Sequence, residues 1–335
     1  MRVSVVVPVY NKGPFLEECF NSIFNQTYAD FEVIAVDDKS TDDSLERLRA
    51  MRDERLRVVA LERNLGPSGA AQRAIDLSRG EYIIRVDADD IMLPERFAKQ
   101  VAFMDERPRL IASGCHLRLF GEEEELWPYP IGEDRCRAEL LFSNPVAQGA
   151  SILRASLLRE HNLRYDDHWP RIGEDWFYWA ILSRFGEFDN LDEALVLYRR
   201  GPQNSNAGVD RVSYRETIIR GLYPLLGLPL SDEDVIHHLM ALRSFKERPN
   251  AERLRRMRAW LEHMSAMNRE RHLFPQAAFD DRLALCWGNL FFALVPYGRG
   301  LALRHWLMGP QRPPGRLLYL LKHMVNSLLA RRVGS

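Results

Sequence analysis

The sequence predicts an α/β protein: a mostly parallel sheet with helices on both faces, followed by an all-α carboxy-terminal extension. Short apolar runs rich in β-branched residues alternate with segments of helical periodicity through the first 210 residues. Each apolar run ends in polar residues, as expected where the strands of a parallel sheet meet a ligand. Beyond residue 210 the pattern becomes helical and basic, with proline-marked breaks.

Length and charge divide the chain in two. At 335 residues it exceeds one average domain, and we expect domains at 1–210 and 211–335. The net charge of −1 hides 20 Lys+Arg against 10 Asp+Glu after residue 210, and 26 against 37 before it. The first part therefore carries about −11 and the second about +10. This split suggests a catalytic half and a half that faces something anionic.

Composition favours a cytoplasmic protein. The four cysteines show no CxxC pairing and no metal-ligand spacing, as expected for reduced cysteines in a core. We expect no signal peptide, because the first strand begins almost at the amino terminus. The longest apolar run, residues 283–295, is interrupted by Gly288 and Asn289 and is too short to span a bilayer.

The first strand and helix have clear patterns. Residues 3–9 (VSVVVPV) form a near-continuous apolar run, which is typical of a strand buried on both faces. A helix is predicted from Pro14, because proline favours the first helical position. Its core-facing positions recur with helical spacing at Leu16, Cys19, Phe20, Ile23 and Phe24.

Two more strands and two more helices follow. Residues 31–36 (FEVIAV) predict a buried strand that ends in Asp37 and Asp38, and Ser40 or Thr41 then caps a helix. Residues 56–61 predict a third strand. The loop 64–69 (NLGPSG) leads into a helix over 70–77 that is rich in small residues.

The stretch 81–94 (EYIIRVDADDIMLP) is the centre of the sequence pattern. Its strand, residues 82–86, runs directly into Asp87, Asp89 and Asp90, and a helix over 94–104 follows. Asp87 and Asp89 straddle one residue, so in an extended chain both side chains point the same way. Mg²⁺ or Mn²⁺ would satisfy these crowded carboxylates, and phosphate oxygens would complete its shell. The alternative is a solvated acidic turn.

Polar residues end several predicted strands, which a single acidic turn does not explain. The carboxyl ends of the strands carry Tyr10, Asp38, Asn64 and the Asp87/Asp89 pair. Because such ends meet at one edge of a parallel sheet, a common ligand site is expected there. Neither GxGxxG nor GxxxxGK[ST] follows any strand, which argues against dinucleotide-binding dehydrogenases and P-loop NTPases.

Five segments, in order, resemble the family 2 glycosyltransferases of the GT-A type. They are PVYNK, VDDKSTD, NLGPSGAAQRA, VDADD and GED, and the resemblance covers roughly residues 1–205. It implies transfer of a sugar from a nucleotide-diphosphate donor, with inversion at the anomeric carbon and dependence on Mg²⁺ or Mn²⁺.

The resemblance also implies roles for donor-site residues. Pro8 and Tyr10 would line the nucleotide pocket, with Tyr10 near the base, and Asp38 would accept hydrogen bonds from uracil or ribose. A strand-end proline and an interfacial tyrosine remain alternatives. The loop beside base and ribose would be shaped by Asn64, Gly66 and Ser68, unless these form an ordinary turn.

The family's DxD motif matches Asp87 to Asp89. The resemblance implies that Asp89 contacts the metal directly, whereas Asp87 holds ribose or a metal-bound water. Asp90 could instead cap the following segment. Arg199 and Ser205, in and after a closing strand, are candidates for contacting the diphosphate; for Arg200 surface salt bridging is an equal alternative.

The acceptor side is expected in the second half of the domain. The family's general base is the second acid of the pair in GED, which is Asp175, and Glu174 would orient neighbouring groups. A carboxylate suits this role, because the attacking hydroxyl must lose its proton. The alternative is that both acids merely complement the amino terminus of the helix that is expected over 176–185. The segment 144–153 matches a family segment beneath the donor sugar.

The carboxy-terminal tail predicts a basic amphipathic helix over 317–332. Apolar residues recur over three turns, and from Arg299 to the end the chain has seven Lys+Arg and no acid. Such a helix can lie on an anionic membrane. The alternative is that its leucine face docks onto the helical domain or onto a second subunit.

These observations favour a glycosyltransferase on the cytoplasmic face of the membrane. The donor would be a nucleotide-sugar, with UDP preferred, and the acceptor a glycan or lipid-linked saccharide of the cell surface. A sugar-phosphate nucleotidyltransferase is the alternative within the same fold, although it needs a Gly-rich basic loop that PVYNKGPF lacks. A non-catalytic scaffold that uses the basic half is the other alternative. No nucleic-acid-binding motif is present.

Overall fold

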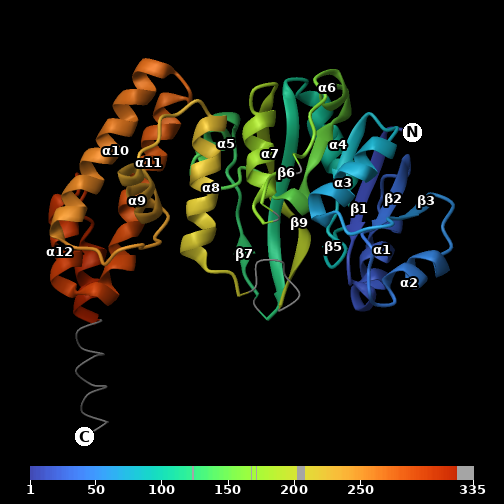
Figure 1. Cartoon of the computed structure of the whole chain (residues 1–335), viewed down its shortest axis with the longest axis horizontal. Coiled ribbons are helices and arrows are strands. Elements are labelled where there is room, and N and C mark those ends of the chain that lie inside the picture. Colours follow the sequence, from blue (N-terminus) through green and yellow to red (C-terminus); the bar gives the residue numbers. More distant parts are fainter. Residues whose placement is uncertain (123, 167, 171, 202–207, 323–335) are drawn as a thin grey trace, which may run out of the picture. The chain divides into compact units, whose positions relative to one another are not determined.

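The computed structural model describes all residues except 123, 167, 171, 202–207 and 323–335. The chain divides into two compact units, Met1–Val209 and Asp210–Ser335, and each is described by itself (Figure 1). The first unit is α/β, and the regular secondary structure of the second, within its described residues, is all helical.

One sheet organises the first unit. Within the described residues its strands run in the order β3-β2-β1-β4-β8-β6-β9-β5, with β7 paired to β6. The strands are β1 (Val3–Val9), β2 (Phe31–Asp37), β3 (Leu56–Ala60), β4 (Tyr82–Arg85), β5 (Ile91–Met92), β6 (Leu110–Gly121), β7 (Leu126–Trp127), β8 (Ile152–Arg154) and β9 (Glu187–Arg200).

The first four strands in the chain form a parallel half-sheet. β1 lies between β2 and β4, and β2 pairs with β3, all in parallel register. The other half is mixed, because β8 runs antiparallel to both β4 and β6 while β9 runs parallel to β6. The predicted fold class is confirmed, and every antiparallel pair includes at least one strand that follows β4 in the chain.

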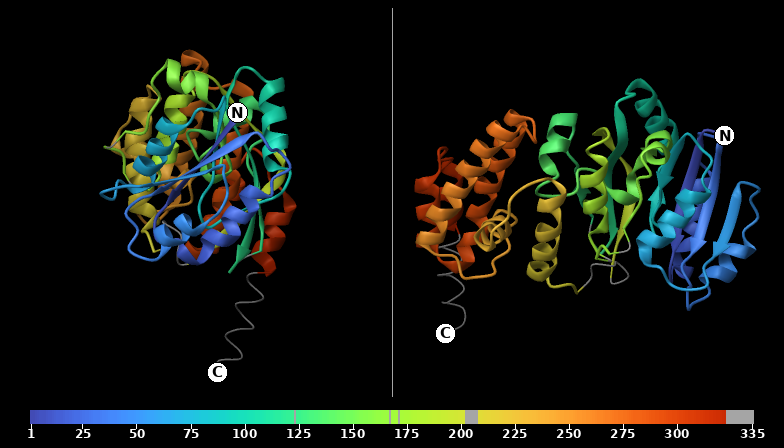
Figure 2. Two further views of the ribbon diagram at one scale, coloured as in Figure 1. Left: turned by 90° about the vertical axis from the view of Figure 1, so that its right-hand side faces the viewer. Right: turned by 45° about the horizontal axis from the view of Figure 1, so that its top comes forward.

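Helices lie on both sides of this sheet (Figure 2). Three packing relations matter most: α1 and α4 cover one face through the shared core, and α3 contacts β1 and β2. The helices of this unit are α1 (Leu16–Phe24), α2 (Ser44–Ala50), α3 (Gly66–Leu77), α4 (Arg96–Glu106), α5 (Glu133–Glu139), α6 (Ala155–Glu160) and α7 (Glu174–Leu182), with 3₁₀ turns η1 (Gly13–Phe15) and η2 (Gln148–Ala150).

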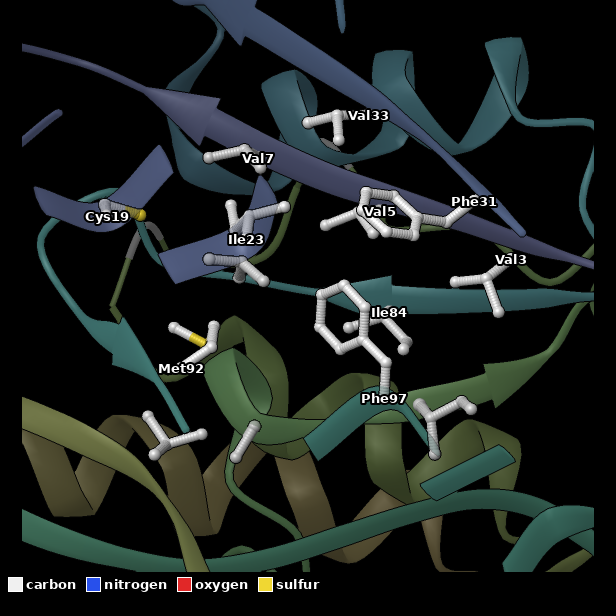
Figure 3. Packing of buried hydrophobic residues seen from close by; sticks show 14 of the residues in the cluster. Val3, Val5, Val7, Cys19, Ile23, Phe31, Val33, Ile84, Met92 and Phe97 are labelled. Atoms are coloured by element: carbon white, nitrogen blue, oxygen red, sulfur yellow. The ribbon is translucent and has the colours of Figure 1, made fainter. Parts of the chain in front are cut away.

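The core explains why β1 is apolar on both faces. Alternate residues Val3, Val5 and Val7 pack with α1 and α4 in one buried cluster (Figure 3). In that cluster Phe97 of α4 meets Phe31 of β2 edge to face, with ring centroids 5.5 Å apart. The intervening residues of β1 are also buried, so the strand is covered on both sides.

Two predicted helices begin earlier than expected, and both changes concern the site. The helix predicted over 70–77 begins at Gly66, so Ser68 lies in the first turn of α3 instead of in a loop. The helix predicted after GED begins at Glu174, which puts both acids in the first turn of α7. Gly173 precedes them with φ 84°, a conformation that glycine adopts without strain.

The second unit is a set of packed helices. Side-chain caps begin α8, α9 and α10, the second through a reciprocal pair between Ser231 and Asp234. Among the described residues, no helix is both long and apolar enough to cross a bilayer. The elements are α8 (Arg211–Leu225), α9 (Asp232–Ala241), α10 (Ala251–Arg271), α11 (Gln276–Leu294), η3 (Val295–Tyr297) and α12 (Arg299–Met308).

Residues 317–322 of the predicted tail helix are described and are helical, in a helical segment that begins at residue 314. Leu320 is buried, whereas Leu318 and Leu321 are 55% and 56% exposed. Tyr319 meets the ring of Phe292 on α11 edge to face, at 5.1 Å between centroids. One side of this segment therefore docks on α11 while two leucines face solvent. Residues 323–332 of the predicted helix lie outside the described residues.

The aromatic contact in the core generates a stability prediction. Phe97→Ala should lower the free energy of unfolding by about 3–5 kcal/mol, because it removes a fully buried ring and leaves a cavity beside Phe31. Urea denaturation followed by circular dichroism measures the change. Phe185→Ala, at a ring 37% exposed, should cost less than half as much. Equal losses in the two variants would contradict this account of the core.

Candidate active site

The loops after β1 and β2 are tied together at the carboxyl edge of the sheet. The backbone N–H of Asn11 donates to Ser40 Oγ at 3.0 Å, and Asn11 Oδ1 accepts from the N–H of Thr41 at 2.8 Å. Pro8 lies opposite Val36 in the parallel register, half-buried. Tyr10 is 46% exposed, so its ring is available to a ligand at this edge.

Asp38 connects this edge to the start of α3. Its buried carboxylate accepts from the backbone N–H of Leu65 at 2.6 Å, and its carbonyl accepts from Asn64 Nδ2 at 2.9 Å. Gly66 then takes φ 79°, which opens the helix. Half-buried Ser68 follows in the first turn. The structure thus brings Asp38 next to the segment 64–68, which contains Asn64, Gly66 and Ser68.

The acidic turn after β4 is folded back on itself and largely buried. The N–H of Asp90 donates to the carbonyl of Asp87 at 3.1 Å. Asp90 Oδ1 accepts from the backbone N–H of Arg199 on β9 at 2.9 Å, whereas Asp90 Oδ2 has no partner among the described residues. Burial, and then the charges of Asp87 and Asp89, raise the pKa of Asp90 well above its ordinary value.

Two cations face the carboxylates of this turn. Lys12 Nζ lies 2.5 Å from Asp89 Oδ2, and an Arg85 nitrogen lies 3.1 Å from Asp87 Oδ1. Burial raises the pKa of Asp89 even though Lys12 opposes that rise. Burial and mutual repulsion thus outweigh these two contacts, so protonation of a carboxyl or a further cation would stabilise the cluster. The solvated acidic turn, the alternative at the sequence level, does not describe it, because Asp89 and Asp90 are 7% and 1% exposed.

The donor set fits a hard divalent ion in part. Oxygen ligands from Asp89 and Asp87 are the kind that Mg²⁺ and Mn²⁺ bind. Beside them, the buried Asp90 Oδ2 has no partner among the described residues, so a nearby cation would stabilise it. Within the described residues, no three His, Cys, Asp or Glu side chains are gathered to hold an ion alone. Phosphate oxygens and water would therefore have to complete the shell.

Arg199, a candidate for the diphosphate, is engaged inside the protein. Its Nε donates to the carbonyl of Asp89 at 2.9 Å, and its guanidinium pairs with Glu18. The same guanidinium lies between the rings of Phe15 and Phe120, at 5.0 and 4.4 Å from their centroids. These contacts fix the acidic turn against β9. The other diphosphate candidate, Ser205, lies outside the described residues.

The second acidic pair, Glu174 and Asp175, is in the first turn of α7. Asp175 Oδ2 accepts from Asn144 Nδ2 at 2.6 Å, and Asp175 Oδ1 accepts from the N–H of Trp176 at 2.9 Å. Glu174 is buried. Both acids sit within electrostatic reach of Asp87, which raises the pKa of each. Both acids therefore do lie at a helix amino terminus, as the alternative states. They also lie close enough to Asp87 to interact with it, which the alternative does not explain.

The surroundings raise the pKa values of the two acids to different extents. Desolvation, followed by the charge of Asp175, raises the pKa of Glu174 to about 8. Desolvation raises the pKa of Asp175 to about 6. Glu174 therefore holds a proton more readily than Asp175, which leaves Asp175 as the better acceptor of a proton.

Aromatic residues pack against α7, the helix that carries the acidic pair. Tyr165 stacks on Tyr178 of α7 at 4.1 Å between centroids, and its hydroxyl accepts from Gln148 Nε2 at 2.9 Å. Trp169 packs on Phe177 at 5.8 Å and on Tyr165. Gln148 is thereby fixed in the segment 144–153.

Four residues of the site were missed from the sequence. Arg85 had a readable signal, since it is a lone charge in an apolar strand, two residues before Asp87 and on the same face. Lys12 lies in the segment PVYNK, and Asn144 and Gly149 lie in the segment 144–153, but neither segment indicates which distant carboxylate these residues reach. At Gly149 a Cβ atom would lie 2.4 Å from Asp87 Oδ2, so the close approach requires glycine.

Comparisons with known proteins agree on one family. Residues 4–161 match Glycosyl transferase family 2. The chain is 34% identical over 219 residues to an uncharacterized glycosyltransferase of Haemophilus influenzae, covering 61% of this chain and 67% of that one. It is 30% identical over 216 residues to the amylovoran biosynthesis glycosyltransferase AmsE of Erwinia amylovora, covering 61% and 78%.

Solved structures share the fold. S. aureus TarS 1–349, in complex with UDP-GlcNAc, superimposes with a TM-score of 0.58 at 20% identity, covering 91% of this chain and 90% of that one. The mannosyltransferase PcManGT of Pyrobaculum calidifontis, in complex with GDP-Man and Mn²⁺, gives 0.51 at 18% identity, covering 88% and 86%.

The close approach at residue 149 generates a prediction. Gly149→Ala should lower the free energy of unfolding by about 1–3 kcal/mol, because the new methyl group must push Asp87 away from Arg85. Urea denaturation measures the loss. Gly300→Ala adds the same methyl group in α12, where nothing lies within 4 Å, and should leave stability unchanged or raise it. A neutral Gly149→Ala would show that the carboxylate moves freely.

Proposed function

This chain belongs to Glycosyl transferase family 2, and we propose that it transfers a sugar from a UDP-sugar to a hydroxyl of a cell-surface glycan, with inversion. One observation carries the proposal. Two acidic groups from separate elements, Asp87–Asp90 after β4 and Glu174–Asp175 on α7, converge at the carboxyl edge of the parallel strands. One group suits a diphosphate with its counter-ion, and the other suits an acceptor.

The donor nucleotide would lie along the ends of β1 and β2. Tyr10 offers an exposed ring to the base, and Asp38 and Asn64 offer polar groups beside Gly66 and Ser68. The ribose would be held at Asp87. UDP is preferred because a structure of the same fold, TarS, was solved with UDP-GlcNAc. Pro8 and Arg199 then act as supports, the second by fixing the acidic turn.

Asp89, assisted by Asp87, would hold Mg²⁺ or Mn²⁺ with the donor phosphates. A structure of the same fold, PcManGT, contains Mn²⁺. When bound, the ion neutralises the charge that develops on the departing diphosphate. Lys12 now lies against Asp89, so it is positioned to turn toward phosphate oxygens once that carboxylate has another partner.

Asp175 would act as the general base. It takes the proton of the acceptor hydroxyl as that oxygen bonds to the anomeric carbon from the face opposite UDP. The bond between the anomeric carbon and the UDP oxygen breaks, and its electron pair leaves with the diphosphate. Asn144 and the N–H of Trp176 hold the carboxylate in place. Protonated Glu174 positions the pair without competing for the proton.

The acceptor proposal rests on relatives and on the basic second unit. AmsE is named for amylovoran biosynthesis, which supports a role in polysaccharide assembly. The exposed leucines at 318 and 321, near Arg316 and Lys322, suit an anionic membrane that carries a lipid-linked or surface glycan. The enzyme would then act at the cytoplasmic face of the membrane.

The metal role predicts that Asp89→Asn abolishes turnover, because the amide keeps the shape but loses the charge. Binding of UDP measured by calorimetry should also lose its dependence on Mn²⁺. Asp43→Asn removes an exposed charge paired with Arg47 and should change neither property. Full activity of the unmodified protein in EDTA would refute the metal role.

The base role predicts that Asp175→Asn lowers kcat by about 10² or more while UDP affinity stays within twofold. Glu174→Gln imitates the protonated acid and should keep most of the activity at pH 7. Loss of UDP binding in step with activity would assign Asp175 to the donor instead.

The raised pKa of Asp175 predicts the pH profile. The base works only when ionised, so kcat/KM should be level above pH about 6 and fall ~tenfold per unit below it. A pH–rate profile checks this, with UDP binding measured at each pH as the control. A fall that begins only near pH 4, where an ordinary carboxyl titrates, would contradict the raised pKa of Asp175.

The membrane role predicts that Leu318→Glu weakens co-sedimentation with anionic liposomes about tenfold or more, because it replaces apolar burial with a like charge. Leu126→Glu makes the same change in the first unit, at a leucine 51% exposed against 55%, and should have no effect. Equal binding by all three proteins would favour docking of the leucine face on protein.

A further inference from the structure

The second unit contains a cavity of about 350 Å³, lined by residues of α10, α11 and the segment after α12. This volume lies at the small end of the range for ligand pockets. Its walls combine apolar surface with a few polar groups, and the residues that matter here are Glu262, Ser265, Asp280, Trp287, Gln311 and Arg316.

The carboxylates of the cavity are already neutralised or hydrogen-bonded. Glu262 pairs with Arg258 at 3.0 Å. Asp280 accepts from Gln276 Nε2 at 3.0 Å and from the hydroxyl of Ser265. Neither carboxylate therefore needs the guanidinium of Arg316. Each still has acceptor capacity for the hydroxyl groups of a ligand.

Arg316 is a half-buried cation without a counter-charge among the described residues. Burial lowers its pKa, and no carboxylate acts against that shift. Its guanidinium lies 5.6 Å from the ring centroid of Phe291. The guanidinium lies so close to α11 that a Cβ atom at Gly288 would be 2.9 Å from Arg316 Nη2. The glycine thus leaves room for a cation at the cavity wall.

Trp287 forms part of the cavity wall. One face of its ring stacks on His305, with centroids 4.2 Å apart and planes at 24°. Its indole nitrogen is buried and has no hydrogen-bond partner among the described residues, so a ligand in the cavity would meet the ring and not the N–H. The tryptophan therefore contributes apolar surface to the wall.

We propose that this cavity is a second carbohydrate site, which binds a saccharide carrying an anionic group such as phosphate. Arg316 would hold the anion, and Glu262, Asp280 and Gln311 would accept from sugar hydroxyls. A phosphate on an alkyl chain would leave these acceptors unmatched. The site goes beyond the transfer reaction: it would hold a glycan on the helical unit, separately from the donor.

The test uses ligand-observed NMR titration of the full chain, with UDP in excess to occupy the donor site. The probes are glucose 6-phosphate, glucose, inorganic phosphate and hexyl phosphate. Glucose 6-phosphate should bind at least about tenfold more tightly than each of the other three. Arg316→Gln should weaken its binding about 10- to 100-fold, the usual effect of losing a charge-assisted hydrogen bond.

Two further variants keep the test decisive. Arg312→Gln removes an exposed arginine of the same segment that does not line the cavity, and it should bind the sugar phosphate normally. Ala284→Phe, at an exposed lining position, should block binding while leaving every charge in place. Hydrolysis of the donor should be unchanged in both Arg316→Gln and Ala284→Phe, so a failure of the proposed transfer reaction is measured separately.

Three outcomes would overturn the proposal. Inorganic phosphate binding as tightly as glucose 6-phosphate would reduce the cavity to an anion site. Hexyl phosphate binding as tightly would replace the saccharide with a lipid-like ligand. Binding that survives both Arg316→Gln and Ala284→Phe, or no binding of glucose 6-phosphate at all, would remove the site.

Discussion

The structure of the first unit depends on holding like charges together in a place with little water. Asp89 and Asp90 are almost fully buried, and Asp87, Glu174 and Asp175 lie within electrostatic reach of one another. Such crowding persists only where cations and donors oppose it. Here Arg85, Lys12, Asn144 and two backbone amides do so, and each comes from a different part of the fold.

The parallel half-sheet makes this convergence possible. Because β1, β2 and β4 run the same way, the chain leaves each of them at one edge, where its polar residues meet. The mixed half then brings β9 and α7 to the same edge from later in the sequence. The acidic groups are thus arranged by topology, and local sequence decides only which residue stands at each strand end.

Most of this could be predicted from patterns with a short range. Strand ends, the acid pairs and the family resemblance are local, and they put Asp38 and Asp89 after strands and Asp175 at the start of a helix, where the structure also has them. Lys12 and Gly149 could not be predicted, since a lysine in a loop and a glycine in a 3₁₀ turn carry no sign of which distant carboxylate they face. The antiparallel pairing of β8 was also beyond reach, because three residues carry no signal of which strands they pair with or in which direction.

The hydrogen bond between Asp90 and β9 depends on amino-acid identity at one end only. The acceptor is a side chain, but the donor is the backbone N–H of residue 199. Every amino acid except proline supplies that donor, whereas few can replace the aspartate. Sequence drift along β9 is thus tolerated at this contact, and drift in the acidic turn is not. The acidic turn and strand β9 can therefore diverge at different rates at this bond, whereas the bond from Arg199 Nε to the carbonyl of Asp89 still depends on the arginine.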